Sequence, residues 1–338
     1  MTLALIVVCL SPLAGYPQQQ SGPAVQAPIQ ATTELVRVDV SVLDKSGNFV
    51  GGLVQQDFHV LDGGVAQPIV YFSPVEAPAQ VLVLVETSPA VYLIHNEHLI
   101  AAYALLGGLA HDDQIALVTY DQAPHSILGF TPDKSAFAAA LGQIQYTLGT
   151  AQLNFFDSIS SVVDWLAPIH GKKALVILST GLDSSPPSRW DALARKLRAD
   201  DVVIFPVALG GSLRQPISKK KKSAKNGRKS EAPPQKSSPD QENPLSFEKA
   251  DAALRSLAQI TGGRAYFPLS AKDFVPMYRE IAAALRHQYV LGFLPAQDGH
   301  FHSLTVQVGD SRSQPAGPAA KGTDYHVFAR EGYLAPGP

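Results

Sequence analysis

Runs of consecutive aliphatic residues mark the centre of this chain. Residues 81–85, 174–178 and 202–209 are apolar without polar alternation, which is typical of strands that are covered on both faces. Segments of helical length lie between them, the clearest at 155–166, where apolar residues recur at three- and four-residue spacing. This alternation of buried strands and helices predicts an α/β fold with a mostly parallel sheet between two layers of helices.

A different pattern occupies the two ends of the chain. Val36, Val38, Val40 and Val42 alternate with polar residues, as expected of a strand with one buried face. Further short strands are expected at 58–61, 69–72, 289–294, 304–308 and 325–329. Because the early and late strands are alike, we expect both chain ends to form one small antiparallel β domain, with the α/β body inserted between them.

Helix boundaries can be read from residues that cap or interrupt helices. Asp133 precedes a helix that is expected to run to Ile144, and Gly262 follows the last apolar residue of another. Pro276 lies inside a further helical segment that follows Ser270. Since proline has no amide hydrogen, that helix is expected either to begin at Pro276 or to lose an internal hydrogen bond there.

Charge is distributed unevenly along the 338 residues. Residues 214–243 contain nine basic and three acidic side chains, including the run Lys219–Lys222, among Ser, Pro and Gln. This composition cannot form a core and predicts a disordered, solvated insertion. The rest of the chain has 18 basic and 26 acidic residues and is therefore acidic, which argues against nucleic-acid binding by the folded part.

The first residues have the pattern of a secretory signal. The apolar run at 3–10 is too short to span a bilayer as a helix and has the length of a signal-peptide core, and 16–33 reads as a flexible leader. Cys9 is the only cysteine, so a processed chain would contain neither a disulfide nor a thiol. We expect a secreted or periplasmic protein of the cell envelope, without a stable membrane span after signal removal.

Three stretches carry a family resemblance. They are 36–64, which contains the run Asp-Phe-His-Val-Leu-Asp-Gly-Gly, the α/β pattern at 81–267, and 285–293 together with the closing Ala-Arg-Glu-Gly-Tyr at 329–333. Together they resemble the von Willebrand factor type A (VWA) domain, in particular the VWA-related proteins of acidobacteria. The resemblance implies a Rossmann-like, doubly wound sheet. The implied division is a signal peptide (1–15), a leader (16–33), an N-terminal β segment (34–78), a VWA domain (79–287) that contains the insertion 214–243, and a C-terminal β segment (288–338).

The resemblance also implies where a ligand site would lie. Ligand-binding VWA domains have a metal-ion-dependent adhesion site, built from an Asp-x-Ser-x-Ser run after the first strand, a Thr on a second loop and an Asp after the fourth strand. Here the run reads Glu86-Thr87-Ser88-Pro89-Ala90. Thr150 is available on the second loop, although the alternative alignment places Leu153 there. Thr180 stands where the Asp is expected, and Asp183 follows three residues later.

These substitutions predict a degenerate site. Glu86, Ser88 and Thr150 are the candidate metal ligands, and Thr87, Thr180 and Asp183 are the candidate residues of a ligand-binding crevice. Magnesium is usually held by one or two carboxylates in near-octahedral oxygen geometry, and only Glu86 offers a carboxylate in the run. We therefore expect no cofactor, with Mg²⁺ as the one candidate.

The function implied by the resemblance is that of an exported, non-enzymatic protein-binding module. Its partner is expected to be a protein that binds at the carboxyl end of the VWA sheet. No G-x-G-x-x-G, P-loop, G-x-S-x-G or H-E-x-x-H sequence occurs, which argues against common enzyme classes. Two alternatives remain open, a structural component of the cell envelope and an α/β enzyme.

Overall fold

The computed structural model describes most of the chain. The described residues are 35–76, 78–92, 95–146, 152–211, 247–309 and 325–337. The expected signal peptide, the leader and the Lys-rich insertion lie outside them. No helix of the described part is long and apolar enough to cross a membrane.

A five-stranded sheet forms the centre of the α/β body. Its strands are β5 (Ala79–Glu86), β6 (Gln114–Tyr120), β7 (Pro124–Thr131), β8 (Lys172–Ser179) and β9 (Val203–Ala208). They lie in the order β7-β6-β5-β8-β9, with β7 antiparallel to β6 and every other pair parallel. After β5, the chain first adds β6 and β7 on one side of this central strand and then β8 and β9 on the other. The strand order therefore reverses between β5 and β8. Sheets of this kind bind ligands at such a reversal, beyond the carboxyl ends of the strands.

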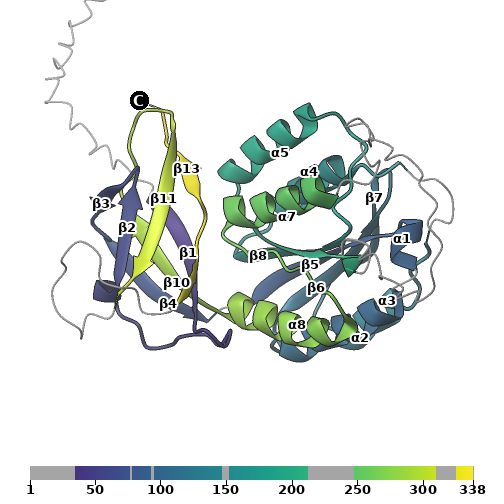
Figure 1. Ribbon diagram of the computed structural model, residues 1–338. Coiled ribbons are helices and arrows are strands. Elements are labelled where there is room, and N and C mark those ends of the chain that lie inside the picture. Colours follow the sequence, from purple (N-terminus) through teal and green to yellow (C-terminus); the bar gives the residue numbers. More distant parts are fainter. Residues whose placement is uncertain are drawn as a thin grey trace, which may run out of the picture. The chain divides into compact units, whose positions relative to one another are not determined.

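Helices cover both faces of this sheet (Figure 1). One face packs against α2 (His95–Gly108), α3 (Lys134–Leu141) and α8 (Ala271–Arg286), and the other against α4 (Phe155–Leu166), α5 (Ser188–Ala199) and α7 (Phe247–Thr261). A short helix, α1 (Pro89–Tyr92), follows β5. The doubly wound α/β architecture expected from the sequence is therefore confirmed.

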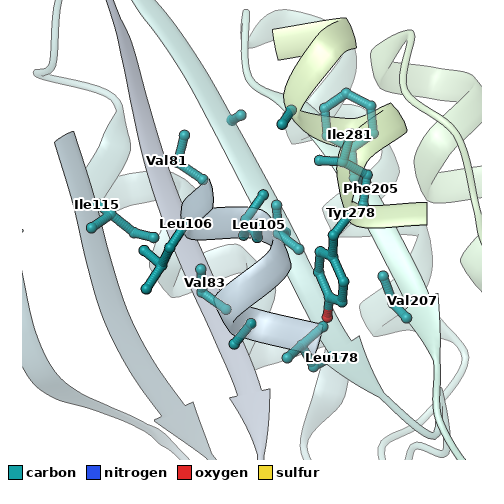
Figure 2. Close-up of a cluster of buried hydrophobic side chains, with 14 of the residues drawn as sticks. Val81, Val83, Leu105, Leu106, Ile115, Leu178, Phe205, Val207, Tyr278 and Ile281 are labelled. Carbon is teal, nitrogen blue, oxygen red and sulfur yellow. The ribbon is translucent and has the colours of Figure 1, made fainter. Parts of the chain in front are cut away.

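The register of β5 explains why its five aliphatic residues are consecutive. Val81 and Val83 belong to the core beneath α2 and α8, whereas Leu82 and Leu84 belong to the core beneath α4, α5 and α7. Figure 2 shows the first of these cores, in which Tyr278 reaches from α8 toward the sheet. Since successive strand residues point to opposite faces, a strand between two helical layers needs apolar residues at every position.

The two ends of the chain form a β domain of two antiparallel four-stranded sheets. Its elements are β1 (Val36–Leu43), the 3-10 turn η1 (Gln55–Asp57), β2 (Phe58–Asp62), β3 (Val65–Gln67), β4 (Tyr71–Glu76), β10 (His287–Phe293), β11 (Phe301–Val308), β12 (His326–Phe328) and β13 (Gly332–Leu334). The strand orders are β12-β1-β10-β4 and β13-β11-β2-β3, so each sheet contains two strands from the early part of the chain and two from the late part. Val38, Val40, Tyr289 and Leu291 contribute to the core of this domain. The β domain built from both chain ends is confirmed.

Several local details differ from the sequence-based expectation. The strand expected at 69–72 is observed as β4, which begins later, at Tyr71, and extends to Glu76, and β3 was not expected. Helix α8 begins at Ala271 and keeps Pro276 in its interior, because Asp273 Oδ2 accepts the Ser270 amide at 2.8 Å and fixes the start there.

Candidate functional site

The candidate site lies at the reversal of strand order between β5 and β8. β5 ends at Glu86, and β8 ends at Ser179, with Val85 and Leu178 paired in the parallel ladder. The carboxyl ends of the two strands are therefore adjacent. Thr180 follows β8 directly, and Tyr120 ends β6 on the other side of β5, paired with Glu86.

Hydrogen-bond donors from four residues surround the Glu86 carboxylate. Ser88 Oγ donates to Oε1 at 2.5 Å, and Thr180 donates to Oε2 through its amide at 2.6 Å and its hydroxyl at 2.8 Å. The Tyr120 hydroxyl and Ser179 Oγ lie 3.2 and 3.0 Å from Oε2 and 2.6 Å from each other. Both carboxylate oxygens of Glu86 are thus engaged by the protein itself.

The network is closed to solvent. Glu86, Tyr120 and Ser179 have no exposed surface, and Thr180 is 1% exposed. A carboxylate in such a place is costly unless its oxygens accept hydrogen bonds, and the surrounding donors supply them. Burial, with a smaller contribution from the negative charge of Glu86, raises the pKa of Tyr120 far above its ordinary value. The phenol therefore stays protonated and acts as a donor.

The structure brings together three of the predicted site residues, Glu86, Ser88 and Thr180, in one hydrogen-bonded cluster. Thr87 is also buried, but its hydroxyl donates to the backbone carbonyl of Tyr120 at 3.1 Å, away from the carboxylate. Thr150 lies outside the described residues. The hydroxyl groups of this site therefore face protein atoms.

Asp183 takes a different position from the other predicted residues. Its Oδ2 accepts the backbone amide of Phe156 at 3.2 Å, in the first turn of α4, and its Oδ1 accepts the amide of Ser185 at 2.8 Å and the Ser185 hydroxyl. A carboxylate at a helix N-terminus satisfies free amides and interacts favourably with the helix dipole. In this arrangement Asp183 caps α4 and links it to the loop after β8.

The oxygen atoms gathered here do not fit a magnesium site. Mg²⁺ needs several oxygen ligands with free lone pairs at fixed distances. The single carboxylate of the cluster, Glu86, already accepts hydrogen bonds on both oxygens, and the hydroxyls around it donate inward. Within the described ranges there is no group of three or more His, Cys, Asp or Glu side chains that could hold a metal ion.

Sequence reasoning missed two members of the cluster, Tyr120 and Ser179. Each is the last residue of a strand that neighbours β5, Ser179 directly after an apolar run and Tyr120 one residue after one. Polar side chains at the carboxyl ends of adjacent parallel strands converge on one edge of the sheet. That position is the signal that could have identified both residues.

Comparison with known proteins finds similar structures but no match in sequence. No protein-family model matches the chain, and no curated protein matches it in sequence. The conserved hypothetical protein BatB from Bacteroides thetaiotaomicron aligns with 62% of this chain and 98% of its own, at 15% identity and a TM-score of 0.41. A von Willebrand factor type A protein from Catenulispora acidiphila aligns with 90% of this chain and 64% of its own, at 10% identity and a TM-score of 0.44.

A third similar structure is proximal thread matrix protein 1 from the mussel byssus, which has zinc in its metal-ion-dependent adhesion site. It covers 64% of this chain and 49% of its own, at 11% identity and a TM-score of 0.43. At such low identity and TM-score, these similarities carry no information about what this chain binds. Solved structures similar to the chain thus include VWA domains and a BatB protein.

Proposed function

We propose that this chain is an exported, non-enzymatic protein-interaction module of the VWA type that binds its partner without a metal ion. The observation that carries the proposal is the engagement of both Glu86 oxygens by Ser88, Thr180 and their neighbours. In an adhesion site that uses a metal, the corresponding carboxylate must be free to ligate the ion. Here that carboxylate has a structural role, holding the ends of β5 and β8 together.

The loops around the cluster are tied to one another, which supports a binding role. The Asn154 amide and side chain donate to the carbonyls of Asp121 at 3.0 Å and Gln122 at 2.8 Å. The Ser184 amide donates to Leu153 O at 2.8 Å, and the Leu153 amide donates to Ser184 Oγ at 3.2 Å. The loops after β6, before α4 and after β8 are thereby pre-ordered, and a pre-ordered surface loses less conformational entropy when it binds.

The proposed contact surface consists of exposed residues on these loops. Gln122 and Ala123 follow β6, and Ser184 and Pro186 follow β8. All four are exposed, whereas the hydroxyls of Thr87, Ser88 and Ser179 below them are buried. Because no hydroxyl of the cluster reaches solvent, the site offers no accessible nucleophile, which favours binding over catalysis.

The proposal that the protein is exported rests on the apolar segment 3–10 and the Gln- and Pro-rich segment that follows it. Export and metal-independent binding are separate parts of the proposal, and each is tested on its own.

A pull-down from native envelope extract tests the proposed function. The full chain is used as bait in millimolar Mg²⁺ and in chelator, beside a Gln122→Arg variant and a matched Gln307→Arg control on the exposed side of β11. The proposal expects one defined partner, retained equally in both buffers, lost with Gln122→Arg and kept with Gln307→Arg. Loss of the partner in chelator, or equal loss in both variants, contradicts the proposal, and the absence of any partner favours the structural alternative.

A further inference from the structure

The β domain contains a histidine held between two carboxylates. His302 of β11 has Nδ1 2.8 Å from Oδ1 of Asp62, the last residue of β2. Its Nε2 lies 3.0 Å from Oδ2 and 3.2 Å from Oδ1 of Asp298, in the loop between β10 and β11. The imidazole therefore bridges the end of β2 and the β10–β11 loop.

Tyr333 of β13 completes the cluster. Its hydroxyl donates to Asp62 Oδ2 at 2.9 Å and accepts the Ala296 amide at 3.1 Å. Its ring stacks on the His302 ring, with 5.3 Å between the centroids. Tyr333 is 4% exposed and Asp62 is 8% exposed, so the hydrogen bond between them is shielded from water, whereas the Asp298 side of the ring faces solvent. One imidazole thus sits at the junction of β2, β11, β13 and the β10–β11 loop.

The geometry selects the charged form of the histidine. A neutral imidazole has one N–H and one nitrogen lone pair, whereas the imidazolium has two N–H donors. With a carboxylate on each ring nitrogen of His302, only the imidazolium can donate to both. Loss of the proton leaves a lone pair facing a negatively charged oxygen, which repels it.

The surrounding groups reinforce this preference. Hydrogen bonds to Asp298 first, and then to Asp62, raise the pKa of His302 above its ordinary value. The backbone amide of His300, and then the side chain of His302, lower the pKa of Asp298, which keeps that carboxylate charged. The other ionisable group against the ring is the Tyr333 phenol, whose pKa is raised by burial, so it remains a neutral donor.

We propose that His302 is a pH-sensitive clamp, which in its charged form fastens β13 and the β10–β11 loop to the β2–β11 pair and in its neutral form releases them. Because the folded pKa is raised above the ordinary value of 6.5, the stabilisation is fully present below pH 6.5. It is lost as the pH rises through the folded pKa. The clamp therefore loosens on the alkaline side. This inference does not depend on the proposed function.

The test combines a titration with a matched pair of variants. In the full chain, the NMR resonance of the His302 ring is followed against pH, and amide exchange of Tyr333 and Ala335, corrected for its intrinsic pH dependence, is measured over the same range. The proposal expects a His302 pKa above 6.5 and up to a tenfold loss of amide protection for each unit by which that pKa is raised. His302→Gln should abolish the pH-dependent step in exchange, whereas His59→Gln, an exposed histidine on β2, should retain it.

Two results would overturn the clamp. One is a His302 pKa at or below 6.5 in the natural chain, a measurement that does not require any variant to fold. The other is a pH-dependent step at Tyr333 and Ala335 that persists unchanged in His302→Gln.

Discussion

Thr180 donates both its backbone amide and its hydroxyl to Oε2 of Glu86, at 2.6 and 2.8 Å, and so joins the end of β8 to the end of β5. In the adhesion site that this chain resembles, an aspartate is expected at the position of Thr180. An aspartate here would place a second negative charge beside Glu86 in a buried environment, which is unfavourable without a cation. Thr180 is a neutral donor, and the Glu86 side chain is longer than that of an aspartate. The two residues therefore stabilise each other without a cation.

The charge of Glu86 should matter for stability. Glu86→Gln keeps the size of the side chain but replaces one acceptor oxygen with an NH₂ group that faces donors, so we expect a loss of at least about 2 kcal/mol in the free energy of unfolding. Chemical denaturation measures this loss. The matched control is Glu248→Gln on the exposed side of α7, which should change stability by less than about 0.5 kcal/mol. Equal effects of the two substitutions would contradict a structural role for the Glu86 charge.

The hydroxyl of Thr180 can be removed almost without changing its shape. Thr180→Val deletes the donor to Glu86 and should reduce the free energy of unfolding by about 1.5–3 kcal/mol, the range for hydrogen bonds to charged groups. Thr305→Val, at an exposed position of β11, serves as the control and should be near neutral. If Thr180→Val proves as stable as the natural chain, the hydroxyl contributes nothing to the cluster.

Substitution of Lys172 is predicted to increase the free energy of unfolding, whereas the two substitutions above reduce it. This residue is only 7% exposed, and its Nζ has no hydrogen-bond partner among the residues that the structure describes. Burial lowers its pKa from 10.5 to about 8, against the opposing effects of Asp39 and Asp113. Lys172→Met should therefore raise the free energy of unfolding at pH 7 by up to about 3 kcal/mol.

The pH dependence of the free energy of unfolding tests whether the lowered pKa of Lys172 causes the gain in Lys172→Met. The unfolded chain binds more protons than the folded chain between pH 8 and 10.5, so the stability of the natural protein should rise with pH over this window. The advantage of Lys172→Met should shrink over the same window. Lys249→Met, an exposed position on α7, should show neither effect. A Lys172→Met protein that is less stable than the natural one at pH 7 would contradict this account.

The parts of the fold that the sequence predicted are those governed by burial. Val81 to Val85 lie between two helical layers, so every position is apolar and the pattern is unambiguous. The helix at 155–166, α4, was predicted with its observed bounds because its apolar residues lie on one face and pack into a single core. Asp133 was expected to precede a helix, and its side chain does accept the amides of Ser135 and Ala136 at the start of α3.

The parts that could not be predicted depend on partners distant in sequence. β13 has three residues and gains its structure from pairing with β11, so local pattern alone does not define it. The role of Asp183 depends on the amide of Phe156, 27 residues away. Glu86 was correctly placed at the end of a central strand, but its hydrogen bonds come from Tyr120 and Ser179, 34 and 93 residues distant.

The central claim is that the Glu86 carboxylate is committed to protein donors and unable to serve a metal. A triple variant should gain the ability to bind a metal ion. It combines Glu86→Asp, Ala90→Ser and Thr180→Asp, which restore the Asp-x-Ser-x-Ser run and the second aspartate of the adhesion site. This triple variant is expected to be more stable in Mg²⁺ than in chelator. It provides the positive control for the natural chain.

The most direct measurement is the thermal midpoint of the natural protein in millimolar Mg²⁺ and in chelator. An ion that binds only the folded state adds about 2.7 kcal/mol at a hundredfold excess over its Kd, which is readily detected as a rise in the midpoint. We predict the same midpoint in both solutions for the natural chain and a higher midpoint in Mg²⁺ for the triple variant. A midpoint several degrees higher in Mg²⁺ for the natural chain would contradict the account.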